Sequence, residues 1–318
     1  MKKLLAVVIL GSIVLGGLGA AVSGTNQPQK NSDQKETTGT TYVDELDQFM
    51  TTPDGVLPVG WFCPTQNITV NVSVAQSFKP QKEVLTCIQF LMGRNATTTN
   101  PCILAIRDNL THQDLTSAIV NPAEVPIMDP AHMENLTWVT FDVNDIWVTV
   151  NQTYYIVVYT ANMTDHHYPD DYYYVSGNGT NLYPNGTAYL SLDSGKTWEE
   201  ITNGDGCFKT YGLPETFLEV NISSTIYGPK FIIRNIGDYT AWDVTWNVTI
   251  TGGILGLLHK TVIGTIPELG PGNETVVTLG SVVGLGPITL TVRVSAANVR
   301  EIGTTLQAIL IFIFWIIK

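Results

Sequence analysis

The stretch WDVTWNVTIT, residues 242–251, alternates without a break between large apolar and polar side chains. Successive side chains of a β-strand point to opposite faces of the sheet. The stretch therefore directs its apolar residues, from Trp242 to Ile250, into a core and its polar residues toward water. It predicts an antiparallel strand with one buried face.

Short runs of the same kind fill the chain from Trp61 onwards, and no long run with a helical period interrupts them. The expected strands of the first part are 67–75, 84–92, 102–107, 137–143, 153–160, 172–176, 187–192, 197–201 and 207–211. Those of the second part are 217–223, 230–235, 242–251, 260–266, 274–279 and 287–296, with a last strand after Arg300. The pattern predicts an all-β chain built from antiparallel sandwiches or barrels.

The domain organisation follows from breaks in this pattern. Pro214 separates a first β-rich part, 56–213, from a second one, 214–318. The number of strands in the second part predicts a smaller immunoglobulin-like β-sandwich. The polar segment 24–55 is expected to be a flexible linker, because its beginning has no apolar period.

The N-terminal segment 1–23 indicates export. Lys2 and Lys3 precede an apolar run that ends in small residues, which is typical of a secretory signal peptide. The run is also nearly as long as a membrane span, so an uncleaved N-terminal anchor is the alternative. Both interpretations place the rest of the 318-residue chain outside the cytoplasm, at the cell surface. Its net charge of −12 argues against nucleic acid as a partner.

The apolar C-terminal segment, 306–317, has two interpretations. As a helix it is too short to cross the hydrocarbon core of a bilayer, whereas as a strand it supplies the last element of the sandwich. Its isoleucines favour the strand. The alternative is a terminal membrane anchor.

The four cysteines suit an oxidising compartment and are expected to form disulfides rather than a metal site. Four cysteines allow three pairings. We favour Cys87 with Cys102, which closes the shorter loop, and Cys63 with Cys207, which ties the ends of one domain together. Strand alternation argues against the first pair, because it places Cys87 and Cys102 on different faces of their strands.

Sequons for N-glycosylation, Asn-x-Ser/Thr, are far more frequent than chance predicts. They occur at Asn67, Asn71, Asn95, Asn109, Asn135, Asn151, Asn162, Asn178, Asn185, Asn221, Asn247 and Asn273. Alternating strands rich in Asn and Thr also produce such patterns, and both explanations place these side chains on the outer surface. We expect many of them to carry glycan.

The segment DHHYPDDYYY, 165–174, combines possible metal ligands with possible sugar-binding aromatics. The candidate ligands for zinc or a structural calcium are His166, His167, Asp170 and Asp171. The candidate stacking residues are Tyr168, Tyr172, Tyr174 and Trp138, because rigid amphipathic rings suit the faces of sugars. The alternatives are a solvated loop and ordinary core packing.

No catalytic motif marks the chain as an enzyme. The sequence contains no H-E-x-x-H, no nucleophile elbow and no phosphate-binding loop. Carboxylates are numerous, but none of their spacings singles out a catalytic pair.

The stretch SLDSGKTW, 191–198, resembles the Asp-box hairpin of sialidase propellers. In sialidases the motif recurs from blade to blade of the propeller, whereas this chain has one copy. A sialidase also needs a cluster of arginines to bind the carboxylate of its substrate, and this chain has few arginines. Ser191, Asp193, Gly195 and Trp198 are therefore expected to form a structural turn, in which Asp193 accepts backbone hydrogen bonds and Trp198 covers the loop.

Two further resemblances complete the prediction. Six pieces, in order between 75 and 212, resemble the carbohydrate-binding-like jelly-roll modules of archaeal and bacterial secreted proteins: AQSFKP, LAIRD, WVTFDV, TYYIVVYT, YLSLDSGKTW and CFKTYG. RNIGDYTAWDVTW and IPELGPGNETVV, within 234–277, are similar to the adhesion-related immunoglobulin-like modules of prokaryotic envelopes.

The resemblances imply a non-catalytic cell-surface glycoprotein. Its jelly-roll β-sandwich would bind an envelope glycan or a surface protein, and the immunoglobulin-like β-sandwich would serve as an adhesion stalk. The alternatives are the targeting part of an extracellular glycan hydrolase and a purely architectural envelope subunit.

Overall fold

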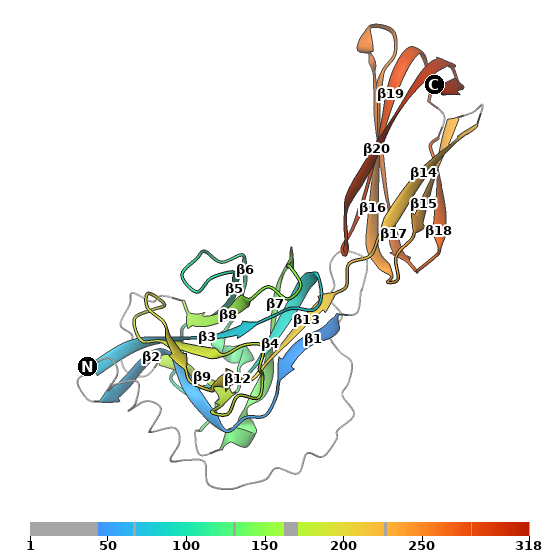
Figure 1. Cartoon of the computed structure of the whole chain (residues 1–318). Helices are drawn as coiled ribbons and strands as arrows, with labels where there is room; N and C mark the ends of the chain where they lie inside the picture. The colour runs from blue at the N-terminus through green and yellow to red at the C-terminus, as the bar shows by residue number, and fades with distance from the viewer. Residues whose placement is uncertain are drawn as a thin grey trace. The chain divides into compact units, whose positions relative to one another are not determined.

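The computed structural model describes residues 44–65, 68–129, 132–161, 171–225, 228–280 and 282–317. These residues form two compact all-β units, which meet in the sequence at Leu213 and Pro214 (Figure 1). Within the described residues the helical elements are three short 3₁₀ turns, and no helix is long and apolar enough to cross a membrane.

The first unit is a jelly-roll β-sandwich. Its strands are β1 (Glu45–Met50), β2 (Gly55–Thr65), β3 (Ile68–Phe78), β4 (Val84–Arg94), β5 (Cys102–Arg107), β6 (Thr116–Val120), β7 (Thr137–Trp147), β8 (Tyr154–Thr160), β9 (Asp171–Asn178), β10 (Ala188–Ser191), β11 (Glu199–Ile201), β12 (Asp205–Gly206) and β13 (Phe208–Leu213). Two 3₁₀ turns, η1 (Pro122–Glu124) and η2 (Met133–Asn135), lie between β6 and β7.

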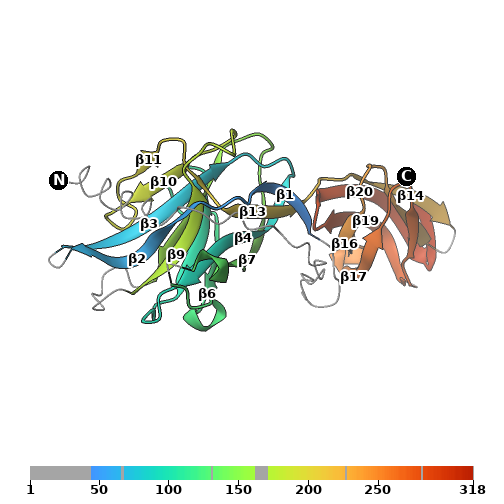
Figure 2. The same cartoon turned by 90° about the horizontal axis from the view of Figure 1, so that it is seen from below.

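Strand β3 connects the two sheets of this sandwich. Its first half pairs with β2, which continues through β9 to β4, β13 and β1, while β7 pairs with the other side of β4. Its second half pairs with β10 on one side, which Figure 2 shows, and with β8 on the other, and β8 continues to β5 and β6. The core lies between the sheets and includes Phe78, Phe90 and Phe141, which are almost fully buried.

Ordered structure begins earlier than the sequence predicts, so the assignment of all of 24–55 as flexible linker is wrong. Strand β1 pairs antiparallel with β13. The buried Gln48 donates its backbone N–H to Thr210 Oγ1 at 3.0 Å, and its side-chain oxygen accepts the hydroxyl of Tyr183 at 2.9 Å. A polar segment is ordered here because the edge of β13 supplies its hydrogen-bond partners.

The second unit is an immunoglobulin-like β-sandwich with strands close to the predicted ones. They are β14 (Leu218–Thr225), β15 (Gly228–Asn235), β16 (Ala241–Gly252), β17 (Leu258–Leu269), β18 (Glu274–Thr278), β19 (Gly284–Ala296), β20 (Val299–Phe312) and β21 (Phe314–Ile317). The sheet β14-β15-β18 opposes the sheet β17-β16-β19-β20-β21. The turn η3 (Ile254–Gly256) joins β16 to β17.

The alternation of 242–251 predicts the core side of β16. Val244, Val248 and Ile250 are almost fully buried, and Trp246 is partly buried against the same core. The C-terminal segment 306–317 is strand rather than helix, as its length favours, but it is not the single buried closing strand that we expected. It comprises the end of β20 and the separate β21, which folds back on β20 with Ala308 opposite Ile317, and Ile311 to Phe314 are exposed.

None of the four cysteines, all of which lie in the described part of the chain, forms a disulfide, so neither predicted pair is present. Cys87 lies on β4, between β7 and β13, whereas Cys102 lies on β5 of the other sheet. Cys63 lies on β2, and Cys207 lies before β13, where its sulfur is 4.0 Å from that of Met50. Strand alternation placed the two residues correctly on different faces, because Cys102 belongs to the core cluster with Leu104 and Ile106 whereas Cys87 does not.

Candidate functional site

The predicted aromatic platform on β9 is a core feature rather than an open surface. Tyr172 and Tyr174 share a face, as alternation requires, but both are buried, with their hydroxyls 3.1 Å apart. The ring of Phe62 packs edge-on against Tyr172 at 5.2 Å. Tyr173, on the opposite face, is fully buried and donates its hydroxyl to the carbonyl of Asn100 at 2.8 Å. Both faces of β9 are covered, so Tyr172 and Tyr174 cannot stack on a sugar.

The other predicted aromatic residues lie elsewhere. Trp138 is on β7, is partly buried against the core, and has the ammonium group of Lys209 4.2 Å from its ring centre. The prediction for Tyr168 falls outside the described residues.

Asp171 fixes the loop between β4 and β5, which contains Thr99 and Asn100. Its carboxylate is buried and accepts hydrogen bonds from the backbone and side chains of Thr99 and Asn100, between 2.6 and 3.3 Å. The other predicted metal ligands, His166, His167 and Asp170, lie outside the described residues. Among the described residues no cluster of His, Cys, Asp and Glu could hold a metal ion.

The Asp-box-like hairpin has the geometry expected of a structural turn. Asp193 accepts the backbone N–H of Thr197 at 2.8 Å and its hydroxyl at 2.6 Å. Ser191 donates its hydroxyl to Asp193 at 2.9 Å and accepts the N–H of Gly195 at 2.9 Å. Gly195 has a φ of 77°, and the ring of Trp198 lies against it. The motif residues therefore make hydrogen bonds within the turn and stabilise it.

The hairpin also explains why one sequon is inaccessible. Asn71 is 3% exposed. Its backbone carbonyl accepts the N–H of Ser194 at 3.1 Å, so the turn lies against β3. The prediction that all sequon asparagines face outward is therefore wrong for Asn71. Asn67 and Asn162 lie outside the residues whose side chains are described. The remaining ones are exposed or half-buried: Asn95, Asn109, Asn135, Asn151, Asn178, Asn185, Asn221, Asn247 and Asn273.

A partly exposed aromatic surface, which the sequence predictions missed, lies on the outer face of the second sheet. Tyr155 and Tyr159 on β8 point away from the core, whereas Tyr154, the first residue of the same strand, points into it. Strand β3 separates β8 from β10, and Tyr189 on β10 has its ring 5.8 Å from that of Tyr155, at 65°. We call Tyr155, Tyr159 and Tyr189 the tyrosine face. The alternation of TYYIVVYT was the signal for two of its members.

Charged groups border the tyrosine face. Arg107 on β5 stands 5.9 Å from the ring centre of Tyr159 and forms an ion pair with Asp114 at 2.6 Å. Asp114 also accepts the hydroxyl of Tyr159 at 3.0 Å. The three side chains therefore form one hydrogen-bonded group that fixes the ring of Tyr159.

Two tyrosines of this face, Tyr159 and Tyr189, have raised pKa values that favour the neutral form. Burial, and then the negative charge of Asp114, raises the pKa of Tyr159 to about 12. Burial raises the pKa of Tyr189 as well, with a further contribution from Tyr155. Neutral hydroxyls can both donate and accept hydrogen bonds, as recognition of a polyhydroxylated ligand requires.

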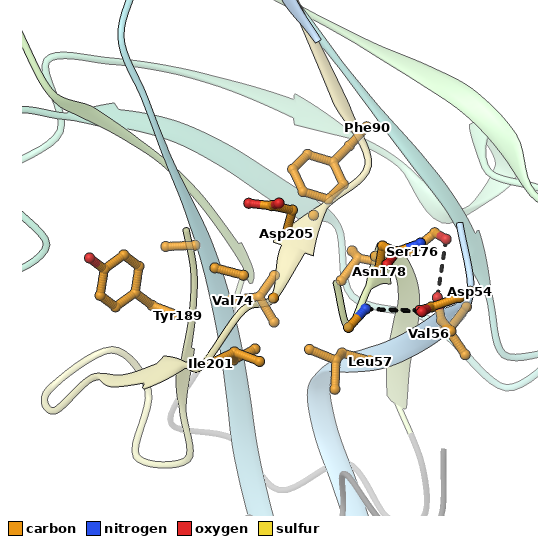
Figure 3. A pocket seen from close by; sticks show the side chains of 18 residues that line it. Asp54, Val56, Leu57, Val74, Phe90, Ser176, Asn178, Tyr189, Ile201 and Asp205 are labelled. Atoms are coloured by element: carbon orange, nitrogen blue, oxygen red, sulfur yellow. Dashed lines mark hydrogen bonds between the residues drawn. The ribbon is translucent and has the colours of Figure 1, made fainter. Parts of the chain in front are cut away.

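A separate cleft of about 240 Å³ opens beside β2, β9 and β10 (Figure 3). Its wall is mainly apolar, with Val56, Leu57 and Val74 among the lining residues. Two carboxylates also line it, and both are engaged by the backbone. Asp54 accepts the N–H of Gly179 at 3.1 Å. Asp205 accepts the N–H groups of Leu182 at 2.9 Å and Tyr183 at 2.8 Å.

No family model matches the chain, and no curated protein matches it in sequence. Among solved structures, a GH2 β-galacturonidase from Eisenbergiella tayi is 10% identical with a TM-score of 0.18, the match covering 83% of this chain and 44% of the enzyme. A β-glucuronidase from Bacteroides uniformis is 9% identical with a TM-score of 0.20, covering 74% of this chain and 26% of that protein. The chain spans less than half the length of these enzymes. Scores this low leave the function to be argued from the chain's own residues.

Proposed function

We propose that this chain is a non-catalytic cell-surface protein whose jelly-roll domain binds an envelope glycan on the tyrosine face. The arrangement that supports this most directly is the pair Tyr155 and Tyr189, whose rings are 5.8 Å apart and half-exposed on the outside of the sheet. Rings held in this way offer rigid apolar area at low entropic cost.

The neighbouring polar groups suit the same ligand. A sugar ring presents C–H groups on its faces and hydroxyls around its edge. The rings of Tyr155 and Tyr189 would contact the faces, while Arg107 and Asp114 lie along the border, where hydroxyls need donors and acceptors. The chain's net charge of −12 favours neutral over anionic glycans.

The cellular setting is part of the proposal. The signal-like segment 1–23 and the exposed sequons support a glycosylated protein outside the cytoplasm. In this arrangement the immunoglobulin-like domain holds the binding domain at the envelope.

The test is binding of the full chain to a glycan array of neutral and acidic polysaccharides, followed by calorimetry with the best ligand. Tyr155→Ala and Tyr189→Ala should each weaken binding about tenfold or more, the effect of removing a central aromatic contact. The matched control is Tyr239→Ala, which removes an exposed tyrosine of the other domain and should leave the affinity unchanged. Equal loss in all three variants, or no glycan binding by the parent, would refute the proposal.

One observation favours a second candidate, the substrate-targeting or catalytic part of a hydrolase: two carboxylates, Asp54 and Asp205, line the same cleft. A glycosidase needs such a pair. This alternative predicts release of reducing sugar from a polysaccharide and its loss in both Asp54→Asn and Asp205→Asn. The binding proposal predicts that the parent protein, Asp54→Asn and Asp205→Asn all release no reducing sugar.

A further inference from the structure

One end of the immunoglobulin-like domain exposes an unusual amount of apolar surface. We call it the apolar tip and define it by three segments: Ile254, Leu255 and Leu257 in the β16–β17 turn, Val283 and Leu285 at the start of β19, and Ile311 to Phe314 in the β20–β21 hairpin. Leu255 is 89% exposed, Leu257 81%, Phe312 67% and Val283 65%. Contiguous exposed apolar patches of this kind mark interaction sites.

The three segments lie together, although they are far apart in sequence. Gly253, in the β16–β17 turn, donates its N–H to the carbonyl of Pro287 on β19 at 2.7 Å. On the other side of β19, Leu285 lies opposite Ile311 of β20. Figure 1 shows the β16–β17 turn, the start of β19 and the C-terminal strand at the same end of the sandwich.

The tip carries no charge. The stretches 247–258, 279–292 and 302–317, which contain all three segments, have no Asp, Glu, Lys or Arg. All nine exposed side chains of the tip are hydrocarbon. A surface that binds another protein normally mixes apolar contacts with hydrogen-bonding groups, and these side chains offer none.

Two residues at the tip contradict the usual chemistry of turns. Leu255 has a φ of 57° and Phe312 a φ of 58°, a left-handed conformation that is unfavourable for bulky side chains and suits Gly or Asn. Both are also among the most exposed apolar residues of the chain. Neither backbone preference nor contact with water favours Leu or Phe here. Such violations of local rules are expected where a residue serves binding rather than folding.

Several backbone groups of the tip form hydrogen bonds within the protein. In the β16–β17 turn, Gly256 donates its N–H to the carbonyl of Gly253 at 3.2 Å, and Leu257 donates to Ile254 at 3.3 Å. In the other turn, Ile311 and Phe314 are paired across a tight hairpin. In hydrocarbon, polar backbone groups must be satisfied within the protein. These internal hydrogen bonds lower the number of polar groups that the turns would carry into the boundary of a bilayer.

From this combination we propose that the apolar tip inserts into the surface of a lipid bilayer. The two turns would place Leu255, Leu257 and Phe312 at the boundary between head groups and acyl chains, as interfacial anchors do. Because the tip has no charge, the attraction comes from apolar area alone and does not depend on anionic lipid.

The experiment is co-sedimentation of the full chain with vesicles of phosphatidylcholine, a zwitterionic lipid, at 50 and 500 mM NaCl. The parent protein should bind at both salt concentrations. The double variant Leu255→Asn and Phe312→Asn should bind at least about tenfold more weakly, because it removes two large apolar contacts. Its melting temperature should be equal or higher, because Asn accepts the left-handed conformation.

The matched control is Ile263→Asn, which replaces an apolar residue of β17 that is 70% exposed but lies outside the tip. It should bind vesicles like the parent. Failure of the parent to bind, or equal binding by the double variant, would overturn the proposal. So would a parent that does not bind vesicles but forms a dimer that the double variant abolishes, since this would assign the tip to a second copy of the chain.

Discussion

At the scale of single residues, Asp193 illustrates a motif used for structure. Its carboxylate holds the N–H and hydroxyl of Thr197 and the hydroxyl of Ser191. Asp193→Ala removes these acceptors, so we expect the free energy of unfolding to fall by about 1–3 kcal/mol. Urea denaturation monitored by tryptophan fluorescence measures this loss.

The control for this prediction is Lys196→Ala, which changes an exposed residue of the same turn and should leave stability within about 0.5 kcal/mol. Glycan affinity should be unchanged in both variants. An Asp193→Ala protein of parental stability that no longer binds glycan would assign the motif to the ligand instead.

The cysteines give a second prediction at this scale. Burial raises the pKa of Cys102 and raises that of Cys207 to about 12, so neither forms a thiolate at pH 8. Cys63 is only partly buried. Iodoacetamide should therefore modify Cys63 first, and the buried thiols only after unfolding, as peptide mass spectrometry can measure. A native protein that resists modification at every cysteine and loses mass by disulfide formation would contradict the free thiols.

At the scale of elements, strand alternation predicted the strands whose position depends on their own local sequence. Residues 242–251 were expected to form a strand and lie within β16, Ala241–Gly252. The same reasoning missed β1, because its polar sequence is ordered by β13, whose residues are more than 150 positions away in the chain. Pairing of this kind depends on tertiary structure and leaves no periodic signal in the strand itself.

The candidate site shows the same limit. Alternation correctly placed Tyr172 and Tyr174 on one face of their strand, but it could not tell that both faces of β9 are covered. It could also have separated Tyr155 and Tyr159 from the core residues of β8. Which face of a strand stays open depends on the layer above it, and one sequence contains no direct record of that layer.

Tyr183 tests whether β1 is an integral part of the first domain. Its hydroxyl donates to Gln48 Oε1 at 2.9 Å and accepts the N–H of Lys79 at 3.3 Å. Tyr183→Phe leaves the buried Gln48 Oε1 and the partly buried N–H of Lys79 without this partner and should lower the free energy of unfolding by about 1–3 kcal/mol. Tyr239→Phe, at an exposed position of the other domain, is the control. Equal stability of the two variants would show that β1 contributes little.

At the scale of the whole molecule, the two domains have separate cores that share no residue. The proposed functions divide in the same way. The tyrosine face belongs to the jelly-roll domain, and the apolar tip belongs to the immunoglobulin-like domain. Glycan binding and vesicle binding should therefore respond to different substitutions, so that Tyr189→Ala spares vesicle binding and the tip variant spares glycan binding.

The stability of the chain at alkaline pH depends on several of its buried tyrosines. Burial raises the pKa of Tyr173, and it raises the pKa values of Tyr159 and Tyr183 to about 12. An unfolded tyrosine ionises near pH 10. Between pH 10 and 12 the unfolded chain therefore loses protons that the folded chain keeps, which favours unfolding. Stability from these groups is complete below pH 10 and is lost as the pH rises through the folded values.

We therefore expect urea denaturation midpoints to fall slightly between pH 8 and 9, where the thiols of Cys102 and Cys207 ionise only in the unfolded chain, and more steeply from pH 10 to 11.5, where the tyrosines do. Absorbance at 295 nm should rise in two stages, first for the exposed tyrosines near pH 10 and then for the buried ones, together with loss of tertiary structure. Tyr159→Phe removes one ionisable group of the tyrosine face and should reduce the slope of stability against pH. A single titration near pH 10 without loss of structure would contradict the burial of Tyr173 and Tyr183, on which the description of the jelly-roll core depends.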